Sequence, residues 1–313
     1  MKLYSHNKTC GFAVLVFVAV ASIVPVAHAQ IRFGGPAKMM LQPKPIALPA
    51  AESSPELFMP ALNMTLLEPG PVGQATTTNL FAQFAVGGGY TTVFSFLNTG
   101  VDVVTGTLFL TGNNAAPVIA TFSSAGLPTL VDSSFPVSIN SGGTQIITAE
   151  PASPGDPTSS GWARVESTGG SLQGVATFQF TVGNTLQTIV GVLSAGATPV
   201  ATIPINDDHT LSQDTGYAIA NPSSSNINIK VVFLHPDGTV HQTLFPPALN
   251  PLPPGRHVAT FVWQDLNDPF LLFRGSMVMI EQSSIPFAVT ALVLNNGLFT
   301  AIPAIPSKAP GIK

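Results

Sequence analysis

Short runs in which apolar and polar residues alternate follow one another from about residue 76 to near the C-terminal end of the chain. The runs are rich in Val, Thr, Phe and Ile, and Gly, Pro, Asn and Ser separate them. A repeat of two residues is typical of a β-strand with one buried face, and no segment keeps the longer period of a helix. The sequence therefore predicts an all-β fold.

The clearest of these patterns lies in residues 161–180. Two strand-like runs, residues 162–167 and 174–180, flank the sequence Thr-Gly-Gly-Ser at residues 168–171. The two glycines can take the positive φ angles that a tight reversal requires. The segment therefore predicts a β-hairpin.

Alternation in the first of these strands sends side chains to two faces. Ala163 and Val165 point to one face, and the other face carries Trp162, Arg164 and Glu166. Because Arg164 and Glu166 are two residues apart on one face, we expect a surface ion pair between them, worth at most ~1 kcal/mol.

A second copy of this pattern occupies residues 274–294, with Glu281 in the place that Glu166 takes in the first copy. Both glutamates are interpreted as exposed residues at strand ends. Residues 215–221 likewise match residues 92–98, and each run ends in Asn before a turn. Corresponding positions lie about 115–123 residues apart, which is too long for a solenoid repeat and suits tandem sandwiches.

The repeat predicts two tandem immunoglobulin-like β-sandwiches, at residues 76–196 and 197–306, followed by a short tail at residues 307–313. Residues 30–75, which are rich in Pro, are expected to form a leader or linker before the first sandwich. An alternative is that residues 57–67 of this leader add a strand to the first sandwich.

The N-terminal residues 1–29 have the features of a secretory signal peptide. Lys2 and Lys8 precede an apolar run at residues 11–26, and a small-x-small sequence ends at Ala29, which predicts cleavage before Gln30. The alternative is an uncleaved membrane anchor, against which Pro25 and the cleavage sequence argue. We expect a secreted protein, located outside the cell, in the periplasm or at the cell surface, without membrane insertion after cleavage.

Composition limits the classes of partner that the mature chain can bind. Only 8% of the residues are charged, against about 25% in typical domains. Cleavage would remove both N-terminal lysines and Cys10, leaving nine basic and fifteen acidic residues and no cysteine. Arg164 is the only cation between Lys44 and Lys230, so the first module cannot neutralise a row of phosphates, and nucleic acid is excluded as a partner.

Three runs of the sequence, FAQFAVGGGYTTVFSFLN, GWARVES and TGYAIANP, resemble uncharacterised secreted bacterial proteins. Proteins of that type carry two tandem immunoglobulin-like β-sandwich modules behind a signal peptide. The resemblance covers most of residues 79–303 and implies a secreted protein of that architecture. It implies no activity and no functional residues.

The densest acidic cluster is a candidate calcium site. Asp207, Asp208 and Asp214 lie just after the junction of the two modules, and calcium prefers several carboxylate and carbonyl oxygens. The alternative is a polar loop closed by side-chain turns, because the aspartates lack a regular spacing. No other cofactor is expected.

Exposed aromatic residues could bind a sugar or a protein partner. Trp162, with Arg164 and Glu166 on the same face, and Trp263 are the candidate binding residues. The alternative is that each Trp packs in a core or at a sheet edge.

Catalysis is not supported by the sequence. The first module contains no histidine, so it cannot hold a Ser-His-Asp triad, and the chain has no Gly-x-Ser-x-Gly segment. We therefore expect no enzyme, with an extracellular hydrolase as a weaker alternative. The sequence favours a non-catalytic secreted or cell-surface module for adhesion, spacing or partner binding, and a carbohydrate-binding protein is the alternative.

Overall fold

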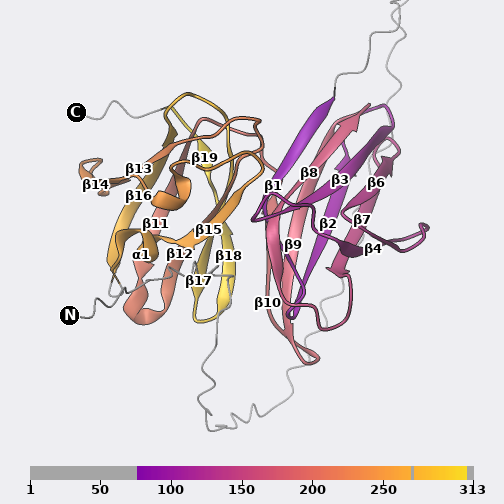
Figure 1. Cartoon of the computed structure of the whole chain (residues 1–313), viewed down its shortest axis with the longest axis horizontal. Helices are drawn as coiled ribbons and strands as arrows, with labels where there is room; N and C mark the ends of the chain where they lie inside the picture. The colour runs from indigo at the N-terminus through magenta and orange to yellow at the C-terminus, as the bar shows by residue number, and fades with distance from the viewer. Residues whose placement is uncertain (1–75, 269–270, 309–313) are drawn as a thin grey trace, which may run out of the picture. The chain divides into compact units, whose positions relative to one another are not determined.

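The computed structural model describes residues 76–268 and 271–308, which form three antiparallel sheets and one short α-helix (Figure 1). The predicted all-β fold is confirmed. The predicted signal peptide, the leader and the residues from 309 onward lie outside the described residues. Within the part of the chain that is described, no helix has the length and apolar character needed to cross a membrane.

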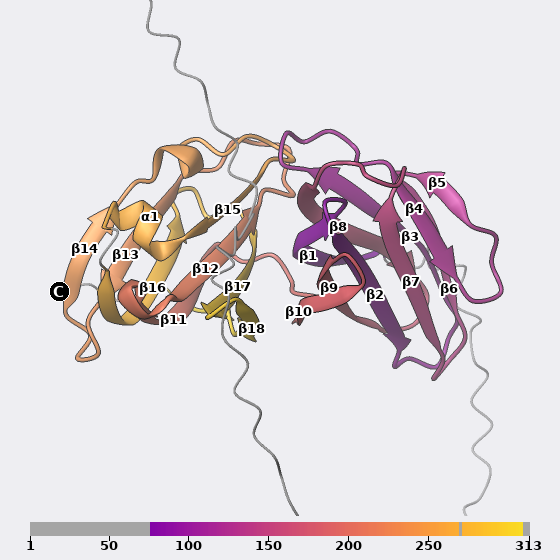
Figure 2. The same cartoon turned by 90° about the horizontal axis from the view of Figure 1, so that it is seen from below.

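Strands β1 to β10, here called the first half, form two sheets. The four-stranded sheet has the order β1-β8-β3-β6, with bounds Thr77–Val86, Ser159–Thr168, Val104–Gly112 and Ser134–Ile139. The six-stranded sheet has the order β10-β9-β2-β7-β4-β5, with bounds Thr185–Leu193, Leu172–Val182, Tyr90–Asn98, Thr144–Pro151, Ala120–Ser124 and Leu130–Asp132. The two sheets form two layers (Figure 2).

Strands β11 to β19, here called the second half, form one sheet. Its path is β14-β13-β16-β11-β12-β17-β18, with bounds Val240–Leu244, Ile229–Leu234, Leu272–Glu281, Val200–Asp208, Gln213–Ala220, Ala288–Asn295 and Leu298–Ile302. Strand β15 (His257–Phe261) pairs with β12, and β19 (Ile305–Pro306) pairs with β11. The helix α1 spans Val262–Leu266, and two 3₁₀ turns span His209–Leu211 and Pro247–Leu249.

The nine-stranded sheet is continuous only through one pair of residues. Strands β11 and β12 are paired at Asp208 and Gln213 alone. The rest of β11 pairs with β16 and β19, and the rest of β12 pairs with β15 and β17. One core cluster contains side chains from both parts, so the sheet folds back on itself into two layers.

The two halves pair their strands in the same order. The first half has β1-β8-β3-β6 in one layer and β10-β9-β2-β7 in the other. The second half has β11-β16-β13-β14 in one layer and β18-β17-β12-β15 in the other. Taken in chain order, these are the same eight strands with the same neighbours. Strands β4 and β5 are additions to the first half, and β19 is an addition to the second.

The predicted hairpins are wrong in both halves. Strand β8 pairs with β1 and β3, whereas β9 pairs with β10 and β2, so the two strands lie in opposite layers. Strands β16 and β17 are separated in the same way. The glycines at residues 169 and 170 do form a tight reversal, and Gly169 has a φ of 86°. A local turn pattern does not determine which strands pair with each other. In both halves the chain crosses at this turn from one layer of the sandwich to the other.

Each half has its own apolar core. In the first half, Phe81 packs edge-on against Phe94 and Phe96, with ring centroids 5.5 and 6.0 Å apart. In the second half, Phe233 packs edge-on against Phe273 at 5.9 Å. These inward side chains come from alternate strand positions, as the sequence predicted. Aromatic rings bury large apolar areas and therefore dominate the stability of such layers.

Candidate functional site

The two halves meet in a small apolar cluster that contains Trp162. This cluster, here called the seam cluster, consists of Leu80, Ala82, Trp162, Ala220 and Ala288. Trp162 is only 3% exposed, and its indole Nε1 donates a hydrogen bond of 2.8 Å to the backbone oxygen of Gly255 in the second half. The expected exposure of Trp162 is therefore wrong, and the alternative, that this Trp is packed, is what the structure shows. The sequence correctly placed Trp162 on the outer face of its strand, but the second half of the chain covers that face.

Polar contacts continue across the seam. His257 Nδ1 lies 2.7 Å from Asn113 Oδ1, and the backbone N–H of Phe299 donates to the Thr188 hydroxyl at 3.2 Å. Phe299 and Leu292 of the second half also pack against the core of the first half. Burial lowers the pKa of His257 to about 4, although a hydrogen bond with the Ala82 backbone acts in the opposite direction. A neutral imidazole is therefore part of this contact at neutral pH.

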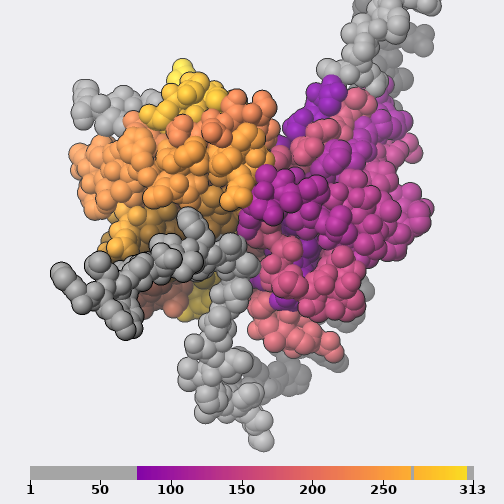
Figure 3. Space-filling view, viewed as in Figure 1, coloured from indigo at the N-terminus to yellow at the C-terminus, as the bar shows by residue number. Residues whose placement is uncertain are grey.

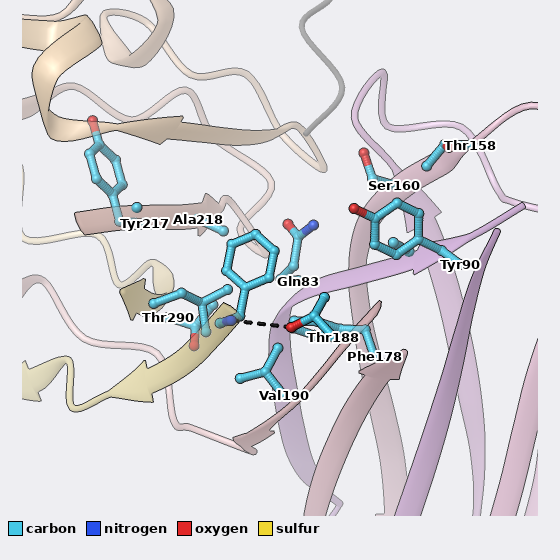
Figure 4. A pocket seen from close by; sticks show the side chains of 14 residues that line it. Gln83, Tyr90, Thr158, Ser160, Phe178, Thr188, Val190, Tyr217, Ala218 and Thr290 are labelled. Carbon is cyan, nitrogen blue, oxygen red and sulfur yellow. Dashed lines mark hydrogen bonds between the residues drawn. The ribbon is translucent and has the colours of Figure 1, made fainter. Parts of the chain in front are cut away.

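A crevice of about 40 Å³ opens beside the seam cluster. Figure 4 shows residues of both halves around it, with Gln83 near its centre and the ring of Tyr217 turned away from it. Its lining is mainly apolar and includes Phe178, Val190 and Leu292. The polar side chains at the crevice are those of Gln83, Tyr90, Thr158, Ser160, Thr188 and Thr290.

The size of this crevice limits what it can bind. Pockets for drug-sized ligands have volumes of roughly 300 to 1,000 Å³, whereas about 40 Å³ holds a few water molecules. Gln83 Oε1 is buried there without a hydrogen-bond partner among the described residues, and a water molecule would satisfy it. Burial also raises the pKa of Tyr90, which keeps its phenol neutral. The crevice is therefore too small for a ligand of that size and is part of the seam.

A larger, open groove lies on the outer face of the six-stranded sheet. It has a volume of about 370 Å³, and its lining includes Leu97, Ile146, Val175 and Leu193. Leu97 is 41% exposed, Ile146 56% and Leu193 76%. Outward-pointing aliphatic side chains on a sheet face are a candidate surface for a partner.

Arg164 and Glu166 form the predicted ion pair on the outer face of the four-stranded sheet. Arg164 Nε lies 2.7 Å from Glu166 Oε1, and both side chains are partly exposed. The guanidinium also lies over the ring of Phe109, 4.5 Å from its centroid. Arg164 therefore covers an apolar part of the sheet, which is a structural role.

Buried polar groups gather at the β11–β12 connection in the second half. Asp207 Oδ1 accepts a 2.7 Å hydrogen bond from the backbone N–H of Thr215, and Asp214 Oδ1 lies 2.7 Å from His209 Nδ1. Burial raises the pKa of Asp207 to about 6, against the effect of its hydrogen bonds with Thr215. Asp208, by contrast, accepts a hydrogen bond from the exposed Thr210 hydroxyl.

The three aspartates of the predicted calcium site are thus engaged by three different partners. Within residues 76–268 and 271–308, no group of three or more His, Cys, Asp or Glu side chains is placed to hold a metal ion. The sequence identified this loop as the most acidic in the chain. It could not show that the carboxylates turn toward separate hydrogen-bond donors.

Trp263 lies beside this connection on helix α1. Its ring stacks on the imidazole of His209 at a centroid distance of 4.7 Å, and it packs against the second core. In the same helix, Asp265 Oδ2 accepts a hydrogen bond from the buried Tyr217 hydroxyl. Burial raises the pKa of Asp265 to about 6, although the hydrogen bond from Tyr217 lowers it, and the pKa of Tyr217 is raised well above its ordinary value, mainly by burial.

Glu281 is buried, so its prediction as an exposed residue is wrong. It is 3% exposed, and its carboxylate accepts hydrogen bonds from the backbone N–H groups of Asn228, Ser283 and Ile285 at 3.2, 2.7 and 2.7 Å. The strand registers pair Ser167 and Glu281, rather than Glu166 and Glu281, as equivalent positions. A shift of one residue moves a side chain to the other face of a sheet.

Comparison of the chain with known proteins gave no match to a family model, to a curated protein or to a solved structure. The resemblance to secreted bacterial proteins with two modules therefore stays a prediction. Sequence reasoning missed three residues that form hydrogen bonds across the seam: Asn113, Gly255 and His257. The sequence signal for this contact is in β12, where the outward positions from residue 216 onward carry only Gly and Ala. Such small side chains leave room for another part of the protein to pack on the strand.

Proposed function

We propose that the chain is a non-catalytic secreted or cell-surface protein in which two immunoglobulin-like β-sandwiches form a rigid spacer that presents a sheet face to a partner. The seam carries this proposal. Trp162 bonds to Gly255, Asn113 contacts His257, and Phe299 packs on the core of the opposite half. A contact of this kind holds tandem units in one orientation, which suits adhesion and spacing.

The immunoglobulin-like description rests on two strand pairs. In the constant-type immunoglobulin order, strands A, B, E and D form one sheet and C, F and G the other. The pairs β2–β7 and β3–β8 correspond to B–E and C–F. The flanking strands differ, because β1 joins β8 and not β2, and β9 joins β2 and not β8. The proposal therefore concerns a sandwich related to that fold in its central pairs.

Carbohydrate binding is the weaker alternative. It depended chiefly on an exposed Trp162, which the seam buries. Trp263 has one neighbour stacked on it already, His209. The buried carboxyls and the tyrosine at the β11–β12 connection are each bonded within the protein, which favours structural roles for them.

Secretion is tested by expressing the full chain with a C-terminal affinity tag in a bacterial host. We expect tagged protein outside the cytoplasm whose N-terminal residue is Gln30, since the apolar run and the small-x-small sequence direct cleavage there. Recovery of a chain that begins at Met1, retained in the cytoplasm, would contradict the proposal.

A further inference from the structure

Two histidines stand side by side on the hairpin of β13 and β14, at the edge of one layer of the second half (Figure 2). The ring centroids of His235 and His241 are 4.9 Å apart, and the angle between the ring planes is 79°. Both residues are exposed to solvent. The register of the two strands shifts between Phe233 and Leu234, so that His241 is an extra residue of β14 without a strand partner. The turn and this shift together bring two imidazoles to one place on the surface.

The protein beneath the two rings holds them in place. Both lie against Phe273, whose ring centroid is 6.0 Å from that of His235 and 5.0 Å from that of His241. Phe273 is itself buried in the second core. The turn between the histidines is closed by Asp237, whose Oδ1 accepts hydrogen bonds of 2.9 and 2.6 Å from the backbone N–H and the hydroxyl of Thr239. A ligand that binds both rings therefore has little ordering of the protein to offset.

The ring nitrogens of this pair are available to a ligand. Among the described residues, neither imidazole of the pair makes a hydrogen bond to the protein. The other two histidines in this part of the chain are engaged through Nδ1, His209 with Asp214 and His257 with Asn113, each at 2.7 Å. The hairpin pair is therefore the candidate ligand set among these four histidines.

The spacing of the two rings suits a shared metal ion. A bond between a metal and an imidazole nitrogen is about 2.0–2.1 Å long, so the centre of a bound ring lies roughly 3.2 Å from the metal. Two rings at the bond angles of about 90–110° that square-planar and tetrahedral ions prefer then have centroids roughly 4.5–5.3 Å apart. The 4.9 Å between the centroids of His235 and His241 falls inside this range.

We propose that His235 and His241 together bind one divalent transition-metal ion of the zinc, nickel and copper class, with water in the remaining positions. Imidazole is a ligand that these ions favour. Among the described residues, no third His, Cys, Asp or Glu side chain is placed to join the pair. Hydrogen bonds with Thr239 lower the pKa of Asp237, so the turn carries a negative charge that favours a cation nearby. The open positions can accept a donor atom from another molecule, and the site does not depend on the proposed spacer function.

Calorimetric titration of the mature protein, prepared without a histidine tag, with ZnCl₂ and with NiCl₂ tests this site. We expect one ion per chain. His235→Gln and His241→Gln should each weaken binding at least about tenfold, because only a single exposed imidazole remains. His209→Gln is the control and should leave the affinity unchanged, because the Nδ1 of His209 is already engaged by Asp214.

The other interpretation of the pair is edge-to-face packing of two rings without an ion. It predicts that the wild-type protein binds Zn²⁺ and Ni²⁺ no more tightly than the double variant with His235→Gln and His241→Gln. That result would overturn the proposal. The histidines are exposed, so both proteins should have the same midpoint of thermal unfolding in the absence of metal.

A further variant tests the spacing of the rings rather than the number of histidines. The exchange of residues 241 and 243, by His241→Thr together with Thr243→His, keeps composition and charge unchanged. It moves one imidazole about 7 Å along β14, to a position opposite Val232 and farther from His235. We expect the affinity for both ions to fall as far as it does in His241→Gln. Wild-type affinity in the exchanged variant would show that no ion lies between the two rings, and would also overturn the proposal.

Discussion

Asn98 and Asn221 make the same hydrogen bonds in the two halves of the chain. Each is fully buried at the end of the second strand of its half. The Asn98 amide donates to the backbone oxygens of Asp102 and Ile139 at 2.7 and 3.0 Å. The Asn221 amide donates to those of Ser225 and Leu252 at the same two distances. The side-chain oxygens accept from the backbone N–H of Gly100 and of Ser223, two residues on.

Replacing either asparagine should therefore destabilise its half strongly. Asn98→Ala and Asn221→Ala each leave one buried carbonyl, one partly buried carbonyl and one N–H without their side-chain partner, and each unsatisfied buried group costs about 1–3 kcal/mol. We expect a loss of roughly 3 kcal/mol or more in the free energy of unfolding, measured by urea denaturation. Asn226→Ala, at an exposed position of the same turn region, should change it by less than about 0.5 kcal/mol. Similar losses at 98 and 226 would contradict a structural role for the buried pair.

Glu281 and Glu166 form a natural pair for a second experiment. Glu281→Gln replaces one acceptor oxygen by an NH₂ group that faces backbone N–H donors, so we expect a loss of about 2–4 kcal/mol. Glu166→Gln removes only an exposed ion pair with Arg164, worth about 1 kcal/mol or less. Thermal and urea denaturation measure both effects. A larger effect at Glu166 than at Glu281 would show that the assigned strand register is wrong.

These two pairs illustrate what the sequence could predict. It identified the alternating strands and the repeated asparagine, because both are local patterns of side-chain type. It wrongly matched Glu281 to Glu166, because a local pattern of side-chain types shows neither a one-residue offset between strands nor the layer to which each strand belongs. The burial of Trp162 was missed for a related reason. Its covering surface, Ala220 and Ala288, lies in the other half of the chain.

The seam should couple the unfolding of the two halves. Trp162→Ala removes the largest side chain of the seam cluster and its hydrogen bond to Gly255. We expect a loss of about 3–5 kcal/mol and, in calorimetry, a single transition that separates into two. Trp263→Ala, within the second half, should lower stability without separating the transitions. A wild-type protein that already shows two independent transitions would contradict the coupling.

Stability should change with pH through three groups whose pKa values are shifted in the folded state. Asp207 and Asp265 have pKa values raised to about 6. The folded state therefore binds their protons more tightly than the unfolded state, and the resulting stabilisation is greatest below about pH 4. It is lost as the pH rises to about 6. His257, with a pKa lowered to about 4, acts oppositely and destabilises the fold as the pH falls from about 6.5 to 4.

On acidification Asp207 and Asp265 stabilise the folded state and His257 destabilises it. We therefore expect the free energy of unfolding to increase from pH 6 to pH 4. Asp207→Asn keeps an oxygen that can accept from the Thr215 N–H, but it cannot titrate. It should therefore lower the magnitude of the slope of the free energy of unfolding against pH by the contribution of one proton, about 1.4 kcal/mol per pH unit. Urea denaturation at several pH values measures this. The assignment of Asp207 fails if the variant and the wild-type protein have parallel pH profiles.

The most direct test of the account is the distance between the two halves in single molecules. Dyes on Thr129→Cys and Thr243→Cys, one exposed site in each half, can be observed by energy transfer at picomolar concentration. The seam predicts one narrow distribution of transfer efficiency that broadens in the Trp162→Ala variant. A broad distribution in the otherwise unchanged protein would mean that the halves move independently, and would contradict the rigid spacer.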